Sequence, residues 1–225
     1  HYIDLLFSSY KKSNPNKAAK CFCIGWGQSK LKEYRNKYPE YEFIYRWIPL
    51  KSRNNIGKAV RDGAILKIKT QLIEESWYNT SKFLWVDADS IILKDISPIL
   101  DKLDEYDFIC TYRPRQKENA KFLASVMGFS SRSEQFINDF SNYIEEKELI
   151  WFYDQLALWY SYTKNKYKIK LYPLSDAEHS IHQNENAIIL DRRKNMPIKR
   201  MIELVGELRS GIVRKADYPV RRKSD

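Results

Sequence analysis

The stretch FLWVDADSIIL, residues 83–93, decides the fold of this chain. Its first four residues are large and apolar without alternation, which is typical of a strand buried on both faces of a sheet. Two carboxylates, Asp87 and Asp89, follow directly, one residue apart. A charge beside a buried strand is costly unless a partner compensates it. The stretch therefore predicts a central parallel strand that ends in a functional site.

Short apolar segments alternate with polar, helix-like segments along most of the chain. We expect strands within residues 2–9, 20–27, 42–50, 83–86, 106–113, 121–131, 167–174 and 186–190. We expect helices within residues 57–77, 97–103, 133–143 and 151–162, the second of them capped by Ser97. This alternation predicts an α/β fold with a mixed, mostly parallel central sheet flanked by helices. Ligands of such sheets bind where the carboxyl ends of the strands diverge, which is where the two aspartates lie.

Length and cysteine content bound the class of protein. The 225 residues can build one ample domain, and no apolar run approaches the length of about 18 residues that a membrane span needs. Cys21 and Cys23 stand two apart in a predicted strand, a poor geometry for a disulfide, so we expect reduced thiols. We therefore expect a cytoplasmic protein, with peripheral contact at the inner face of the cell membrane left open.

The last part of the chain is its basic element. Residues 191–225 hold 11 Lys and Arg against 5 Asp and Glu. We expect a catalytic domain over residues 1–195 and a basic helical extension over residues 196–225. The apolar residues of this extension line one helical face: Ile198, Met201, Val205, Leu208 and Ile212. That face either packs on the catalytic domain or contacts an anionic membrane surface or an adjoining domain.

The two aspartates suit a divalent cation. With Ala88 between them, Asp87 and Asp89 project to one side if the local chain remains extended. Two carboxylates that converge in this way supply the hard oxygen ligands that Mg²⁺ and Mn²⁺ prefer. The simpler alternative is a solvated pair at a strand end. The apolar runs on both sides of the pair favour the metal site.

The segment FLWVDADSIILKDISPIL, residues 83–100, resembles the D-x-D segment of the GT-A-fold glycosyltransferases. The resemblance is to the bacterial lipopolysaccharide and capsule enzymes related to glycosyltransferase family 8, and in element order it covers residues 2–194. It implies a GT-A, Rossmann-like fold in which the D-x-D pair binds Mn²⁺ or Mg²⁺. The metal would hold the diphosphate of a nucleotide sugar, expected to be a UDP-sugar. The sugar would be transferred to a glycan or glycolipid hydroxyl in surface polysaccharide synthesis.

Two further segments carry expected site residues. The segment WFYDQLALW, residues 151–159, resembles the Asp-Gln helix start that lies near the transferred sugar in many of these enzymes. The resemblance implies that Asp154 is a base or sugar ligand and that Gln155 contacts the anomeric region. Asp154 could also cap its own helix. On the helix before the D-x-D strand, Arg61 and Lys67 either reach the donor phosphates or form a solvated face.

The segment NAIILDRRKN, residues 186–195, resembles the family's last strand, which supplies a third metal ligand, commonly His. Asp191 stands in that place and is chemically able to serve as a hard ligand. His179 and His182 compete with it for the role. Three basic residues that would contact the diphosphate follow: Arg192, Arg193 and Lys194.

Two other functions compete with sugar transfer. A haloacid-dehalogenase-like phosphatase would use Asp87 as nucleophile and Asp89 as general acid and base. Such a motif usually lies near the N-terminus, whereas 86 residues precede Asp87 here, and no later acidic pair completes a magnesium site. A nucleic-acid binder would explain the net charge of +10, but the chain has no helix-turn-helix, zinc-ligand spacing or RNP-type motif. We therefore expect no nucleic-acid partner.

Overall fold

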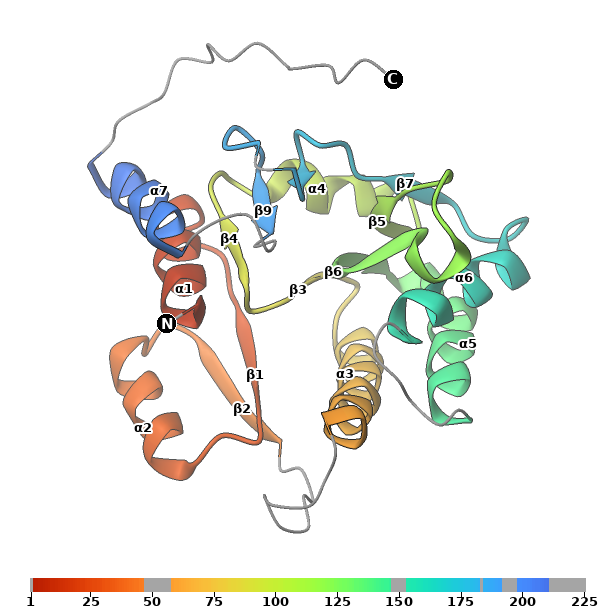
Figure 1. The fold of residues 1–225 in the computed structure, drawn as a ribbon, viewed down its shortest axis with the longest axis horizontal. Coiled ribbons are helices and arrows are strands. Elements are labelled where there is room, and N and C mark those ends of the chain that lie inside the picture. Colours follow the sequence, from red (N-terminus) through yellow and green to blue (C-terminus); the bar gives the residue numbers. More distant parts are fainter. Residues whose placement is uncertain (1, 47–57, 147–152, 183, 192–197, 211–225) are drawn as a thin grey trace. The chain divides into compact units, whose positions relative to one another are not determined.

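A computed structural model describes residues 2–46, 58–146, 153–182, 184–191 and 198–210 (Figure 1). The chain divides into two compact units. Unit 1 comprises His1–Pro15, Ala88–Asp95 and Asp176–Asp225, and unit 2 comprises Asn16–Asp87 and Ile96–Ser175. The chain therefore passes from unit 2 to unit 1 between Asp87 and Ala88, inside the D-x-D segment.

Unit 2 holds two sheets. A parallel pair is formed by β1 (Lys20–Ile24) and β2 (Glu42–Arg46). A four-stranded sheet has the order β3-β6-β5-β7, with bounds Lys82–Val86, Phe122–Ser130, Phe108–Tyr112 and Leu171–Pro173. In it, β6 is antiparallel to both of its neighbours, and β5 and β7 are parallel.

The helices of unit 2 are as follows: α2 (Gln28–Lys37), α3 (Lys58–Asn79), α4 (Ser97–Leu100), α5 (Glu134–Glu145) and α6 (Tyr153–Asn165). Three short 3₁₀ turns complete it: η1 (Asp101–Asp104), η2 (Glu118–Ala120) and η3 (Ser131–Ser133). Helix α5 packs against both α3 and α6. Its buried residues Phe136, Phe140 and Ile144 recur every four positions, which is the spacing of one helical face.

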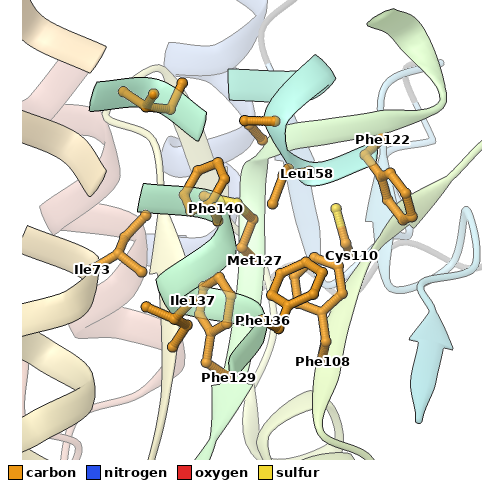
Figure 2. Packing of buried hydrophobic residues seen from close by; sticks show 13 residues of the cluster. Ile73, Phe108, Cys110, Phe122, Met127, Phe129, Phe136, Ile137, Phe140 and Leu158 are labelled. Carbon is orange, nitrogen blue, oxygen red and sulfur yellow. The ribbon is translucent and has the colours of Figure 1, made fainter. Parts of the chain in front are cut away.

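The main core of unit 2 lies between the four-stranded sheet and the helices. Figure 2 shows Phe136, Ile137 and Phe140 of α5 close to side chains of the sheet. The rings of Phe108 and Phe136 are 4.5 Å apart, and those of Phe108 and Phe129 are 5.3 Å apart. Tilted aromatic pairs at these distances add to the stability gained by burial alone. This core holds β6 and α6 in place. Both elements contribute groups to the candidate functional site described below.

Unit 1 is built from segments far apart in the sequence. Its elements are α1 (Tyr2–Ser13), β4 (Ser90–Ile92), β8 (His179–Ser180), β9 (Ile189–Asp191) and α7 (Ile198–Ser210). The strand order is β4-β9-β8, antiparallel and then parallel. Met201, Leu204 and Val205 of α7 are buried in a core that also contains residues of β4 and β9. The apolar face of α7 thus packs within its own unit.

Most of the predicted elements are confirmed, but four expectations were wrong in detail. Residues 83–86 form β3, which lies at the edge of the four-stranded sheet and is antiparallel to β6, and not a central parallel strand. Residues 2–9 belong to the helix α1, because Phe7 and Tyr10 recur at helical spacing and face inward. Ser97 is the first residue of α4, whose cap position is Ile96. Among the strand pairings that the structure describes, three of six are antiparallel, so the sheets are less parallel than expected.

Two expectations about the C-terminal part have different outcomes. A helix is present at Ile198–Ser210, as expected. The domain boundary between residues 195 and 196 stays a prediction, as does contact of the extension with a membrane. Within the described ranges no helix has the length and apolar character to cross a membrane.

Gly128 on β6 provides a test of this packing. A Cβ there would lie 3.1 Å from Ile109 Cβ and 3.3 Å from a methyl group of Leu103, tighter than usual contacts. We expect Gly128→Ala to lower the free energy of unfolding by about 1–3 kcal/mol through overpacking, measured by urea denaturation. Gly206→Ala is the control, because a Cβ on this α7 residue meets nothing within 4 Å. It should raise stability by about 0.5–1 kcal/mol, and equal effects of the two changes would contradict the tight packing.

Candidate functional site

Asp87 stands at the carboxyl end of β3. Its backbone N–H donates to Ser125 O at 2.8 Å, so the chain is still bound to β6 at this point. Residues 88 and 89 then form a turn, and β4 begins at Ser90. The extended conformation that would project Asp87 and Asp89 to one side is therefore absent from residues 88–89. The Asp87 side chain is 35% exposed.

A buried lysine holds Asp87 in place. Lys69 of α3 is only 8% exposed, and its Nζ lies 3.0 Å from Asp87 Oδ1 and 3.2 Å from Oδ2. The same Nζ donates to Ala124 O of β6 at 2.7 Å. The indole N–H of Trp85 donates to Asp87 Oδ1 at 2.9 Å. Asp87 is thus fixed by a cation and a neutral donor, which come from different elements.

Asp154 is the second carboxylate at Lys69. It lies in the first turn of α6, is 13% exposed, and its Oδ2 is 3.4 Å from Lys69 Nζ. Its Oδ1 accepts from the backbone N–H of Gln155 at 2.9 Å. An acid at this end of a helix is favoured by the helix dipole. Since α6 begins at Tyr153, Asp154 lies inside the helix and is not its cap.

The charge balance of this cluster is clear. Burial alone would lower the pKa of Lys69, but the carboxylates of Asp87 and Asp154 outweigh burial and raise that pKa above its usual value. Lys69 is therefore a fixed positive charge between two acids. Burial also raises the pKa of Asp87, and the Lys69 ammonium group and the Trp85 N–H oppose that shift. The cluster offers two carboxyl groups for one ammonium group, which suits it to meet a cation or several hydroxyl donors.

Within unit 1, a second polar cluster surrounds Asp191. Ser90 Oγ donates to Asp191 Oδ1 at 2.5 Å. His179 Nε2 lies 3.0 Å from Asp191 Oδ2, at the distance of an ion pair but without the alignment of a hydrogen bond. The Asp191 side chain is 9% exposed, whereas Asp89 and His182 are both exposed.

The structure brings only some of the expected residues together. Asp87 and Asp154 both contact Lys69. Gln155 is the residue after Asp154 on α6. Lys67 instead points to α5, where its Nζ is 3.5 Å from Glu145 Oε2 and exposed. The Arg61 side chain lies outside the described part of the chain. The same holds for the three residues of the basic run, Arg192, Arg193 and Lys194.

The donor atoms available for a metal are chemically suitable but not assembled. Carboxylates such as those of Asp87 and Asp89 are the hard ligands that Mn²⁺ and Mg²⁺ take. Among the residues that the structure describes, however, no three Asp, Glu, His or Cys side chains gather as a metal-binding group. The two aspartates also belong to different units. A metal site thus stays a prediction.

Lys69 is the site residue that the sequence reasoning missed. Ile65, Ile68 and Leu72 stand at helical spacing in the sequence, whereas the buried apolar positions of α3 include Leu66, Leu72 and Ile73. Lys69 follows Leu66 by three residues and precedes Ile73 by four, so it shares their buried face. A lysine in register with a buried helical face was the available signal.

Comparison with known proteins gives the fold. No family model matches the chain, and no curated protein matches it. Solved structures do match. The galactosyltransferase LgtC, solved with donor and acceptor sugar analogues, has a TM-score of 0.59 at 14% identity, over 97% of this chain and 93% of LgtC. The chain has the GT-A fold. This confirms the fold expected from the D-x-D segment.

Two further structures agree. Mouse xyloside xylosyltransferase 1 has a TM-score of 0.57 at 7% identity, over 87% of this chain and 92% of that one. The glycosyltransferase GlyE of Streptococcus pneumoniae has a TM-score of 0.56 at 16% identity, over 91% of this chain and 57% of GlyE. At these identities the likeness concerns the fold.

Replacing Lys69 tests the cluster. We expect Lys69→Met to lower the free energy of unfolding by about 3 kcal/mol, because it leaves two carboxylates without their cation. The loss should be smaller at pH 5 than at pH 8, since protonation of one carboxylate relieves the repulsion. Urea denaturation at both pH values measures it.

Lys67→Met is the matched control for this change. Lys67 lies on the same helix and its ion pair with Glu145 is exposed, so its replacement should cost within about 1 kcal/mol. If Lys69→Met is as mild as the control at both pH values, the buried ion pairs are not formed.

Proposed function

We propose that this protein is a glycosyltransferase that moves a sugar from a nucleoside-diphosphate sugar to a hydroxyl acceptor. The observation that carries the proposal is the cluster of Asp87, Lys69 and Asp154 on a GT-A fold. Asp87 belongs to the D-x-D pair and Asp154 to the Asp-Gln pair. Two segments singled out in the sequence as parts of one site are thus joined by one ammonium group.

Each member of the cluster has a distinct task in such a transfer. Lys69 holds the side chains of Asp87 and Asp154 in place, so that their oxygens stay oriented before the substrate binds. Asp154 is then a preorganised acceptor for sugar hydroxyls, and Gln155 beside it offers a polar contact. The role of Asp154 as a base toward the acceptor stays a prediction. Positioning of donor and acceptor supplies a large share of the rate in two-substrate reactions.

A divalent cation is part of the proposal. Asp87 and Asp89 would hold Mn²⁺ or Mg²⁺, with His182 as the exposed candidate for a further ligand. When bound, such an ion neutralises the charge that develops on a leaving diphosphate. The basic run at residues 192–194 and Arg61 remain predicted contacts of the same diphosphate.

The donor and acceptor are proposed at the level of chemical class. A UDP-sugar donor and a glycan or glycolipid acceptor are supported by the structural likeness to LgtC, which was solved with donor and acceptor sugar analogues. Synthesis of bacterial surface polysaccharide and a place at the cytoplasmic side of a membrane are parts of the same proposal. The phosphatase alternative is less well supported, because both oxygens of Asp87 face the Lys69 ammonium group within 3.2 Å.

The two aspartates of the D-x-D pair give the first test. The wild-type protein should gain about 2.7 kcal/mol of stability from UDP and Mn²⁺ at a hundredfold excess over Kd, and thermal shift measures this. We expect Asp89→Ala and Asp87→Ala to lose both this shift and sugar transfer. Asp101→Ala is the control, because Asp101 is exposed and its ion pair with Lys82 is long, with 4.0 Å between Oδ1 and Nζ. A full shift in both D-x-D variants would refute the proposal.

Asp154 gives the second test. We expect Asp154→Asn to lower kcat for transfer by about a hundredfold or more, whether the carboxylate orients the sugar or accepts a proton. The thermal shift with UDP and Mn²⁺ should persist, since the proposed contacts of the diphosphate are the D-x-D metal, Arg61 and the basic run at residues 192–194. Steady-state kinetics with a radiolabelled UDP-sugar measures kcat and KM. An unchanged kcat would remove Asp154 from the site.

A further inference from the structure

We propose that Asp191 is a positioning residue that, with Ser90 and His179, fixes the start of β4 and thereby the place of Asp89. Asp191 stands where the family resemblance put a third metal ligand. The role assigned here differs, because the carboxylate serves the protein chain itself. The inference rests on the proposed function only where it gives Asp89 a metal to bind.

The burial of the cluster is the first argument. Ser90 is fully buried, His179 is 1% exposed and the Asp191 side chain is 9% exposed. A carboxylate removed from water to this extent is costly unless its oxygens are compensated. The Ser90 hydroxyl donates to one of these oxygens, and the His179 imidazole lies 3.0 Å from the other. The cluster is therefore organised around Asp191.

The register of the sheet is the second argument. Ser90 and Asp191 are direct partners of the antiparallel pair β4 and β9, and His179 comes from β8 on the other side of β9. Asp191 thus contacts both neighbouring strands through its side chain. A cross-strand side-chain pair of this kind pins the register of a short ladder, and β4 has only three residues.

Hydrogen bonds to α1 and to residue 188 hold the rest of β4. The backbone N–H of Ile92 donates to Ser9 Oγ at 3.0 Å, Ser13 Oγ donates to Ile92 O at 3.1 Å, and Leu93 N–H donates to Ile188 O at 2.8 Å. These bonds secure the far end of the strand. The near end, next to the turn that carries Asp89, is held by the side-chain bond from Ser90 to Asp191.

The same contacts argue against a ligand role for Asp191. A metal ion there would have to reach a side chain that is 9% exposed and share Oδ1 with the Ser90 hydroxyl. Asp89, one residue from Ser90, is exposed. The geometry favours one residue that binds and another that holds it in place.

The test compares metal affinity with the order of β4. We expect Ser90→Ala and Asp191→Ala each to weaken Mn²⁺ binding about ten- to a hundredfold, as loss of a supporting contact around a metal ligand does. Electron paramagnetic resonance of free Mn²⁺ measures the affinity. Hydrogen exchange at Ile91 and Ile92 should accelerate in both variants. Ser90→Thr keeps the hydroxyl group and should restore both readouts.

Controls separate positioning from general damage. Ser161→Ala removes another buried serine hydroxyl, which bonds Ala157 O on α6 within unit 2, and should change neither readout. The double variant of Ser90→Ala and Asp191→Ala should be no worse than Asp191→Ala alone, since both changes remove the Ser90–Asp191 hydrogen bond. Additive losses would contradict the shared contact.

Two outcomes would overturn the inference. If Asp191→Ala abolishes Mn²⁺ binding as Asp89→Ala does while Ser90→Ala has no effect, Asp191 is a ligand. If hydrogen exchange at Ile91 and Ile92 is unchanged in both variants, Asp191 does not position β4. Failure of the proposed function has a different signature, because the wild-type protein would then bind neither Mn²⁺ nor UDP. Even in that case accelerated exchange in the variants would support the role of Asp191 in ordering β4.

Discussion

The ion pairs of one buried lysine hold the centre of unit 2 together. Lys69 reaches Asp87 at the end of β3, Asp154 at the start of α6 and a backbone carbonyl of β6. A lysine in this position is tolerable only while its partners remain, because a buried charge without compensation costs several kcal/mol. The requirement runs in both directions. Each carboxylate also depends on Lys69, so the helix, the strand end and the second helix must all be in place together.

The general fold was predictable from the sequence, and the reasons are local. Runs such as residues 83–86 and 108–112 are apolar and β-branched or aromatic over strand lengths, and α3 and α5 repeat their apolar residues at helical spacing. The misassigned segment, residues 2–9, has a short apolar run that periodicity alone does not separate from a helix. Its identity is set by the tertiary packing of Phe7 and Tyr10.

The site was predictable only where the chemistry lies within a short segment. Asp87 and Asp154 stand out beside apolar runs, but the residue that joins them, Lys69, is 18 positions before one and 85 before the other. No local sequence pattern indicates a contact between residues so far apart in the chain. Asp191 is a different case, since its place in the sequence predicted a ligand while we propose from its burial that it makes a structural contact. Burial of a charged group depends on the assembled strands, which the sequence does not display.

The composition of unit 1 has a consequence for the order in which the protein can fold. Its core joins β4, made early, to β9 and α7, which come about a hundred residues later in the chain. During synthesis at roughly 5–20 residues per second, Ile91 and Leu93 lack their partners for several seconds at least. The segments of unit 2 are complete once Ser175 has been made. The part of the D-x-D segment that carries Asp89 therefore gains its partners in unit 1 only after the segments of unit 2 are complete.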